Sequence, residues 1–230
     1  MLKSGAETYR VEDTMNRIAA AYGLNNAQSY ATPTGINFSI DVAMETNFLR
    51  ITKRSTDLHK IAEVNHISRQ IANGDMQVND AFRLLTTIDK MRLHFPGWLQ
   101  IVAAAFVSGS FSIMFGGTWP DFLPAFIAGG AGFAGMVGFD RLVDIRFISE
   151  FFASLIIGVL AFLFIHNGFG ASLDRVIIGA VMPLVPGLHI TNAVRDLMAG
   201  HLVAGISKGV EASLTAFAIG AGVAVIFGFI

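Results

Sequence analysis

Five long apolar stretches follow Pro96, and they restrict the fold of this chain more than any other feature of its sequence. Each stretch is about as long as a helix must be to cross a hydrocarbon core of roughly 30 Å at 1.5 Å per residue. The sequence therefore predicts a multi-pass α-helical membrane protein with five transmembrane helices. Their expected bounds are 97–117, 119–139, 148–167, 175–194 and 207–230.

Composition divides the chain into two regions. Hydrophobic residues make up 53% of its 230 residues and charged residues only 14%, and most of the lysines and arginines precede Pro96. We expect residues 1–95 to form a small cytoplasmic α+β domain and residues 96–230 to form the transmembrane domain. The net charge of -1, with acids and bases interleaved, indicates that nucleic acid is not a partner.

Hydrophobic periodicity predicts the elements of the amino-terminal domain. Apolar residues at helical spacing predict helices over 5–22, 56–73 and 79–93, and near alternation over 28–53 predicts two or three short strands. The charged residues of the first helix are expected on its solvent-exposed surface. They are Glu7, Glu12, Asp13 and Arg17.

Basic residues also predict the orientation in the membrane. Arg141, Arg146, Arg195 and Lys208 lie in loops that alternate to the same side as the amino-terminal domain. The positive-inside rule then places the amino terminus in the cytoplasm and the carboxyl terminus outside. We expect a multi-pass protein of the cytoplasmic (inner) cell membrane.

Small residues recur at four-residue spacing in the second and fifth stretches, which favours close helix packing. In the fifth stretch they are Ala212, Ala216, Gly220, Ala224 and Gly228. Two interpretations stay open, because such a stripe packs either inside the chain's own bundle or against another subunit.

The fourth stretch is interrupted by Pro183, Pro186 and Gly187. Each proline costs about 3 kcal/mol in an isolated helix interior, so the break persists only where protein or a wet cavity satisfies the freed backbone groups. The helix that restarts after the break directs its positive dipole end toward the break, where a carboxylate can bind. The predicted substrate-binding residues are Pro186, Gly187, Thr191, Asn192 and Arg195.

Side chains near the break have distinct expected roles. Thr191 and Asn192 offer neutral hydrogen bonds, and Arg195 is the expected partner of an anion. His189 is a candidate for proton coupling because its ordinary pKa lies near physiological pH, and Asp196 is expected to orient Arg195. No further cofactor is predicted. The alternative is a proline kink that serves packing, with Arg195 and Asp196 paired at the interface.

A second group of polar residues favours a different function. His59, Glu63 and His66 are spaced so that one helical face could present all three to a divalent metal. The alternative functions are therefore a membrane-anchored metal-dependent hydrolase that uses these residues, or a structural or regulatory membrane subunit. A solvated polar face is the simpler interpretation of the spacing, since Leu58, Ile61 and Ile67 claim the apolar face.

Several sequence blocks resemble those of the threonine/serine exporter family. They are Leu184–Leu188, Thr191–Leu197, Gly5–Thr8 and Thr32–Ile36. Proteins similar to this chain are either one long polypeptide with two membrane halves or two separate chains, of which this chain resembles the domain-bearing five-helix half. The resemblance implies export of small amino acids such as threonine and serine, or of a dicarboxylate such as succinate. It also implies a second membrane subunit, a homo-oligomer, or both.

Overall fold

The computed structural model describes residues 1–91, 95–143 and 145–228, and it is mostly helical with one small three-stranded sheet. The chain folds into two compact units. One contains Met1–Leu93 and Leu188–Val210, and the other contains His94–Gly187 and Glu211–Ile230. The predicted end of the fifth span, Ile230, lies outside the described residues.

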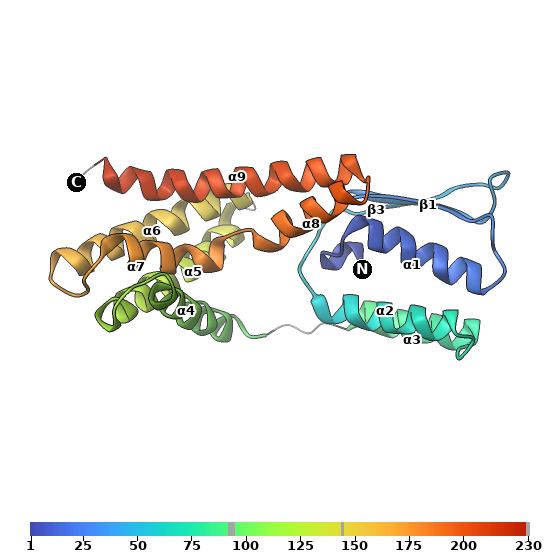
Figure 1. Ribbon diagram of the computed structural model, residues 1–230, viewed down its shortest axis with the longest axis horizontal. Coiled ribbons are helices and arrows are strands. Elements are labelled where there is room, and N and C mark those ends of the chain that lie inside the picture. The colour runs from blue at the N-terminus through green and yellow to red at the C-terminus, as the bar shows by residue number, and fades with distance from the viewer. Residues whose placement is uncertain (92–94, 144, 229–230) are drawn as a thin grey trace. The chain divides into compact units, whose positions relative to one another are not determined.

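The first unit is built on a helix and a sheet. A short 3₁₀ turn (η1, Leu2–Ser4) precedes α1 (Thr8–Ala21), and the antiparallel strands follow in the order β1 (Gln28–Thr32), β2 (Gly35–Ser39) and β3 (Asn47–Arg50). The helices α2 (Leu58–Ala72) and α3 (Val78–Lys90) complete the segment. α1 lies between the sheet and the α2–α3 pair (Figure 1). Three helices and three strands thus occur where the periodicity predicts them.

Two hydrophobic clusters hold this unit together. One joins Leu2, Ala6 and Val11 to Ala31, Ile51 and Ile61. The other packs α2 against α3 through Ile67, Ile71, Ala81 and Ile88. The unit also contains α8 (Gly187–Met198) from Leu188 onward and the beginning of α9 (Leu202–Phe227).

The second unit is a helical bundle. It contains α4 (Gly97–Met114), α5 (Trp119–Val143), α6 (Arg146–His166), α7 (Leu173–Val181), the short η2 (Met182–Leu184) and the remainder of α9. The helices α4, α5, α6 and α9 are each long and apolar enough to cross a membrane, and α7 with η2 and α8 makes a fifth candidate only as a bent pair. The chain is therefore consistent with a multi-pass membrane protein of four or five spans.

Small residues allow the bundle helices to approach closely. A Cβ on Gly179 of α7 would lie 2.6 Å from the backbone nitrogen of Ser112 in α4, and one on Gly222 of α9 would clash with Ser154 and the carbonyl oxygen of Phe151 in α6. The predicted stripe on α9 is divided, because Ala212 is buried whereas Ala216, Gly220 and Ala224 are exposed. Only the Ala212 end packs inside this chain, and an intersubunit role for the exposed part stays a prediction.

A buried carboxylate also fixes two loops of the bundle. Asp121 at the start of α5 is fully buried. It accepts hydrogen bonds from the backbone and hydroxyl of Thr118 and from the backbone nitrogens of Ala171 and Ser172 just before α7. These hydrogen bonds offset the cost of burying the carboxylate charge. Because the donors come from both loops, Asp121 also connects the α4–α5 loop to the α6–α7 loop.

Candidate functional site

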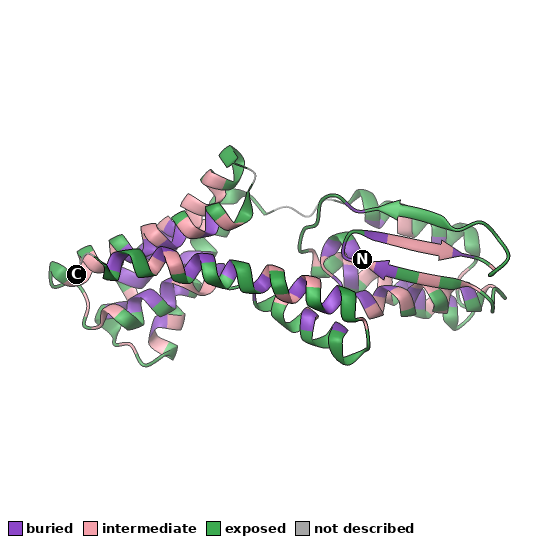
Figure 2. Ribbon diagram, turned by 90° about the horizontal axis from the view of Figure 1, so that it is seen from above, coloured by how far each residue is buried: buried purple, intermediate pink, exposed green. Residues whose placement is uncertain are grey.

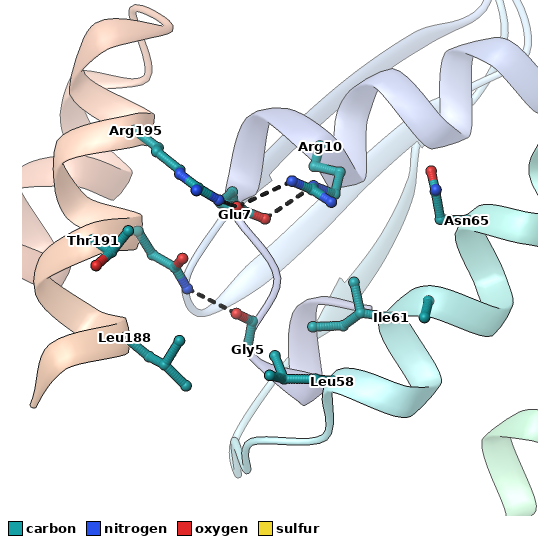
Figure 3. Close-up of a pocket in the computed structure, with 11 residues that line it drawn as sticks. Gly5, Glu7, Arg10, Leu58, Ile61, Asn65, Leu188, Thr191 and Arg195 are labelled. Carbon is teal, nitrogen blue, oxygen red and sulfur yellow. Dashed lines mark hydrogen bonds and ion pairs between the residues drawn. The ribbon is translucent and has the colours of Figure 1, made fainter.

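The break in the fourth apolar stretch is where the two prolines predict it. Helix α7 ends at Val181, η2 covers Met182–Leu184, and Val185 has an extended backbone before α8 begins at Gly187. Proline cannot donate a backbone hydrogen bond, so the α-helical pattern cannot continue unchanged through Pro183 and Pro186. The restarted helix contributes Thr191, Asn192 and Arg195 to the wall of one cavity. Asn192 and Arg195 point toward the amino-terminal segment (Figure 3).

Glu7 is the centre of the resulting site (Figure 3). One of its carboxylate oxygens lies 2.5 Å from Nη1 of Arg195, and the other lies 3.0 Å from Nε of Arg10. Glu7 is only 6% exposed, whereas half of the Arg195 side chain is accessible to solvent. The expectation that Glu7 is a surface charge was wrong, because Glu7 is buried. Its partner Arg195 is 188 residues away in the sequence, so no local pattern could predict the pair.

The electrostatics of Glu7 follow from these contacts. Burial alone would raise the pKa of its carboxyl group, but a backbone hydrogen bond and the guanidinium groups of Arg195 and Arg10 outweigh burial and lower that pKa. Glu7 is therefore ionised at neutral pH and is held between two positive charges.

A cavity of about 430 Å³ adjoins this cluster. α8 contributes Leu188, Thr191, Asn192 and Arg195 to its wall, and Glu7, Arg10 and the α2 residues Ile61 and Asn65 contribute the rest of its principal lining. Asn192 also donates a hydrogen bond of 2.8 Å to the carbonyl oxygen of Gly5. Pockets that bind small molecules have volumes of roughly 300–1,000 Å³, so this one is large enough for a small metabolite.

The structure places the other residues predicted near the break in different surroundings. Pro186 is buried, Gly187 is exposed, and neither lines the cavity. His189 is half-buried on α8. Three of the five predicted substrate-binding residues, Thr191, Asn192 and Arg195, thus meet at one cavity.

Asp196 belongs to a buried network beside the cavity. It is fully buried and accepts hydrogen bonds from the backbone nitrogens of Thr8 and Tyr9, at 2.8 and 3.2 Å. Its other carboxylate oxygen lies 2.7 Å from Nζ of Lys208 in α9, which also contacts the carbonyl oxygen of Ala6 and the hydroxyl of Thr8. The partners of Asp196 are thus Lys208 and the first turn of α1, where the helix dipole stabilises a carboxylate.

The possible metal ligands on α2 do not form a centre. His59 and His66 are exposed and Glu63 is half-buried. Within residues 1–91, 95–143 and 145–228, no three His, Asp or Glu side chains are grouped closely enough to hold a metal ion. His59 and His66 are thus accessible to solvent on α2, and a metal role for them stays a prediction.

Comparison with known proteins decides the family. A family model described as "Putative threonine/serine exporter" matches residues 1–230. The chain belongs to the threonine/serine exporter family. This is a family of transporters, and the long apolar helices of the chain are consistent with an integral membrane protein of a transport system.

The relatives of this family include both short and long chains. The chain is 26% identical over 229 residues to "Probable succinate transporter subunit YjjP" of Klebsiella aerogenes, covering 97% of this chain and 87% of that protein. It is 25% identical to the protein of the same name from Escherichia coli, with coverages of 97% and 88%.

One longer relative matches this chain over only part of its own length. The "Probable threonine/serine exporter" of Mycobacterium tuberculosis is 23% identical over 217 residues, which cover 90% of this chain but only 40% of that protein. No solved structure matches the chain significantly.

Proposed function

We propose that this chain is the domain-bearing subunit of a membrane exporter and that the cavity beside α8 binds its substrate, a small metabolite with a carboxylate group. The observation that supports the proposal most strongly is the meeting of Thr191, Asn192 and Arg195 with Glu7 and Arg10 at one 430 Å³ cavity. The three ionised side chains in the wall sum to a charge of +1, which favours an anionic group in the cavity.

The substrate carboxylate would compete with Glu7 for Arg195. Half of the Arg195 side chain is exposed, so a ligand can reach its guanidinium group, and a guanidinium binds a carboxylate with two parallel hydrogen bonds. If the substrate is an amino acid, Glu7 becomes the partner of its ammonium group. If it is a dicarboxylate, Arg10 becomes the partner of the second carboxylate and Glu7 repels the ligand.

The proposal also covers partner, coupling and orientation. Two relatives are named as transporter subunits, and the chain spans 40% of the longer exporter. We therefore propose a second membrane subunit that supplies the remainder of the pathway, within the cytoplasmic membrane and with the amino terminus in the cytoplasm. His189, on the same helix as the proposed binding residues, is the candidate for proton coupling.

The test is efflux of threonine, serine and succinate, measured by mass spectrometry from cells that express the chain with its second subunit. Arg195→Ala removes the charged partner of every candidate substrate, and the loss of such a hydrogen bond, about 1.5–3 kcal/mol, lowers affinity about 10- to 150-fold. Arg175→Ala is the matched control, because Arg175 is exposed on α7 and does not line the cavity.

Glu7→Gln then separates the two substrate classes. The substitution removes the partner of an ammonium group and the repulsion of a second carboxylate. Amino-acid efflux should fall and dicarboxylate efflux should rise, according to which substrate the protein carries. If Arg195→Ala and Glu7→Gln both transport as the wild type does at equal membrane levels, the cavity is not the binding site.

A further inference from the structure

The third strand is the exposed edge of the sheet in the first unit. The strand order is β1-β2-β3, so one side of β3 pairs with β2 and the other side pairs with no strand among the described residues. All four residues of β3 are exposed, as the entirely green strand in Figure 2 shows. An edge strand of this kind is a template for pairing with another chain.

Apolar side chains gather along this edge. Phe48 and Leu49 are 64% and 56% exposed, and Val42 and Met44 in the preceding loop are 79% and 62% exposed. Leu49 pairs with Ile36 and so lies on the same face of the sheet as Ile36, which packs against the core. Leu49 is nevertheless exposed, and no strand among the described residues pairs with β3 on its outer side.

The hydrogen-bond pattern shows which residues of β3 face outward. Ile51 donates its backbone hydrogen bond to Thr34, and the β2–β3 register continues from this pair through Leu49 and Asn47. Hydrogen-bonding direction alternates along an antiparallel strand. The backbone groups of Phe48 and Arg50 therefore point away from β2, toward the open edge.

We propose that β3 pairs antiparallel with β3 of a second copy of this chain. The outward-facing residues of β3 are Phe48 and Arg50, and they define the register. Phe48 of each copy exchanges backbone hydrogen bonds with Arg50 of the other copy. Leu49 then lies on the two-fold axis opposite Leu49 of the second copy. The two three-stranded sheets join into one sheet of six strands, and both open edges at β3 disappear.

Charge complementarity favours a second copy over other partners. If the pairing continues in this register beyond β3 (Asn47–Arg50), it places Glu45 opposite Lys53 of the second copy, and symmetry forms that pair twice. Arg50 lies opposite Phe48, where a guanidinium stacks on an aromatic ring, and no like charges are opposite each other between residues 45 and 53. Opposite-charge and apolar cross-strand pairs are the contacts that stabilise a sheet.

The absence of cysteine from the sequence makes disulfide crosslinking a direct test. Residues opposite each other in a non-hydrogen-bonded antiparallel pair have Cα atoms about 4.5 Å apart, which is within the range for a disulfide. In the purified full chain, Leu49→Cys should form a covalent dimer under mild oxidation at least about tenfold faster than a cysteine outside the interface. Val78→Cys on α3 is the matched control, since Val78 is also 56% exposed.

Charge reversal tests the register independently of the cysteine chemistry. In the Leu49→Cys background, Glu45→Lys or Lys53→Glu alone replaces two attractive pairs by two repulsive ones and should slow crosslinking about 2- to 30-fold. The double variant Glu45→Lys with Lys53→Glu restores opposite charges and should restore the rate.

The proposal is overturned if Leu49→Cys crosslinks no faster than Val78→Cys, or if the double charge reversal does not recover the rate. It is also overturned if Leu49→Cys stays monomeric and a water-soluble maleimide labels it in detergent but not in a lipid bilayer. That result would assign the edge to the membrane surface instead.

Discussion

Losing one member of the buried pair of Asp196 and Lys208 should destabilise the chain more than losing one member of the exposed Asp13–Arg17 pair. Asp196 is fully buried and the Lys208 side chain is 7% exposed, so both charges lack water and depend on each other. Lys208→Met leaves the carboxylate of Asp196 with only the two backbone donors of Thr8 and Tyr9. Removing one partner of a buried pair costs about 3–5 kcal/mol.

The expected change in melting temperature follows from the size of the chain. For 150–250 residues, 1 kcal/mol changes the Tm by about 2–4 °C, so Lys208→Met should lower it by roughly 6–20 °C. Asp196→Asn combined with Lys208→Met removes both charges and keeps an oxygen that accepts from the first turn of α1. Most of the lost stability should return in this double variant.

The assay is thermal unfolding of the purified full chain in detergent, followed by loss of the monodisperse peak in size-exclusion chromatography. Asp13→Asn is the control, since it removes the exposed pair with Arg17 and exposed pairs contribute about 0–1 kcal/mol. The reasoning is refuted if Lys208→Met unfolds within about 2 °C of Asp13→Asn, or if the double variant is no more stable than Lys208→Met.

Two further predictions concern helix packing and pH. Gly222→Ala should cost about 1–3 kcal/mol by forcing α9 away from α6. In Gly220→Ala the new Cβ has no atom within 4 Å apart from its chain neighbours and its own helix backbone, so the Tm in the same thermal assay should be unchanged or slightly higher. Equal effects of the two substitutions would contradict the packing argument. The pKa of Glu7 is lowered in the folded chain, so its stabilising contribution is present above the ordinary glutamate value of about 4.3 and is lost as pH falls through the folded-state pKa. Between pH 6 and pH 3 the Tm of the wild type should therefore fall more than the Tm of Glu7→Gln. If the Tm of both proteins falls equally with pH, the ionised Glu7 does not contribute to stability.

Local chemistry made much of the fold predictable from the sequence. Apolar periodicity located α1, α2 and α3, and the long apolar stretches located α4, α5, α6 and α9. Pro183 and Pro186 also placed the break in the fourth stretch, because proline acts on the backbone of its own turn. Four helices are long and apolar enough to span a membrane, and the bent pair of α7 with η2 and α8 counts as a fifth span only if both parts cross together.

The partners of the site residues were not predictable in the same way. Spacing within α8 predicted that Thr191, Asn192 and Arg195 belong to one site. No local pattern connects Arg195 to Glu7 or Asp196 to Thr8, because each pair is separated by 188 residues. Lys208 appeared in the sequence only as a basic residue near a span end, and its burial depends on the packing of α9 beside α8 and the start of α1. Two signals were available in the sequence: charged residues in an otherwise apolar half of the chain, and the blocks Gly5–Thr8 and Thr191–Leu197 that resemble the exporter family.

The measurement that tests the central claim most directly is efflux of threonine, serine and succinate from cells that express the wild type, Arg195→Ala or Arg175→Ala at equal membrane levels with the second subunit. The account predicts that one of these metabolites leaves the wild-type and Arg175→Ala cells at the same rate and that Arg195→Ala lowers this efflux at least about tenfold. Equal efflux from all three would contradict a substrate site at Arg195.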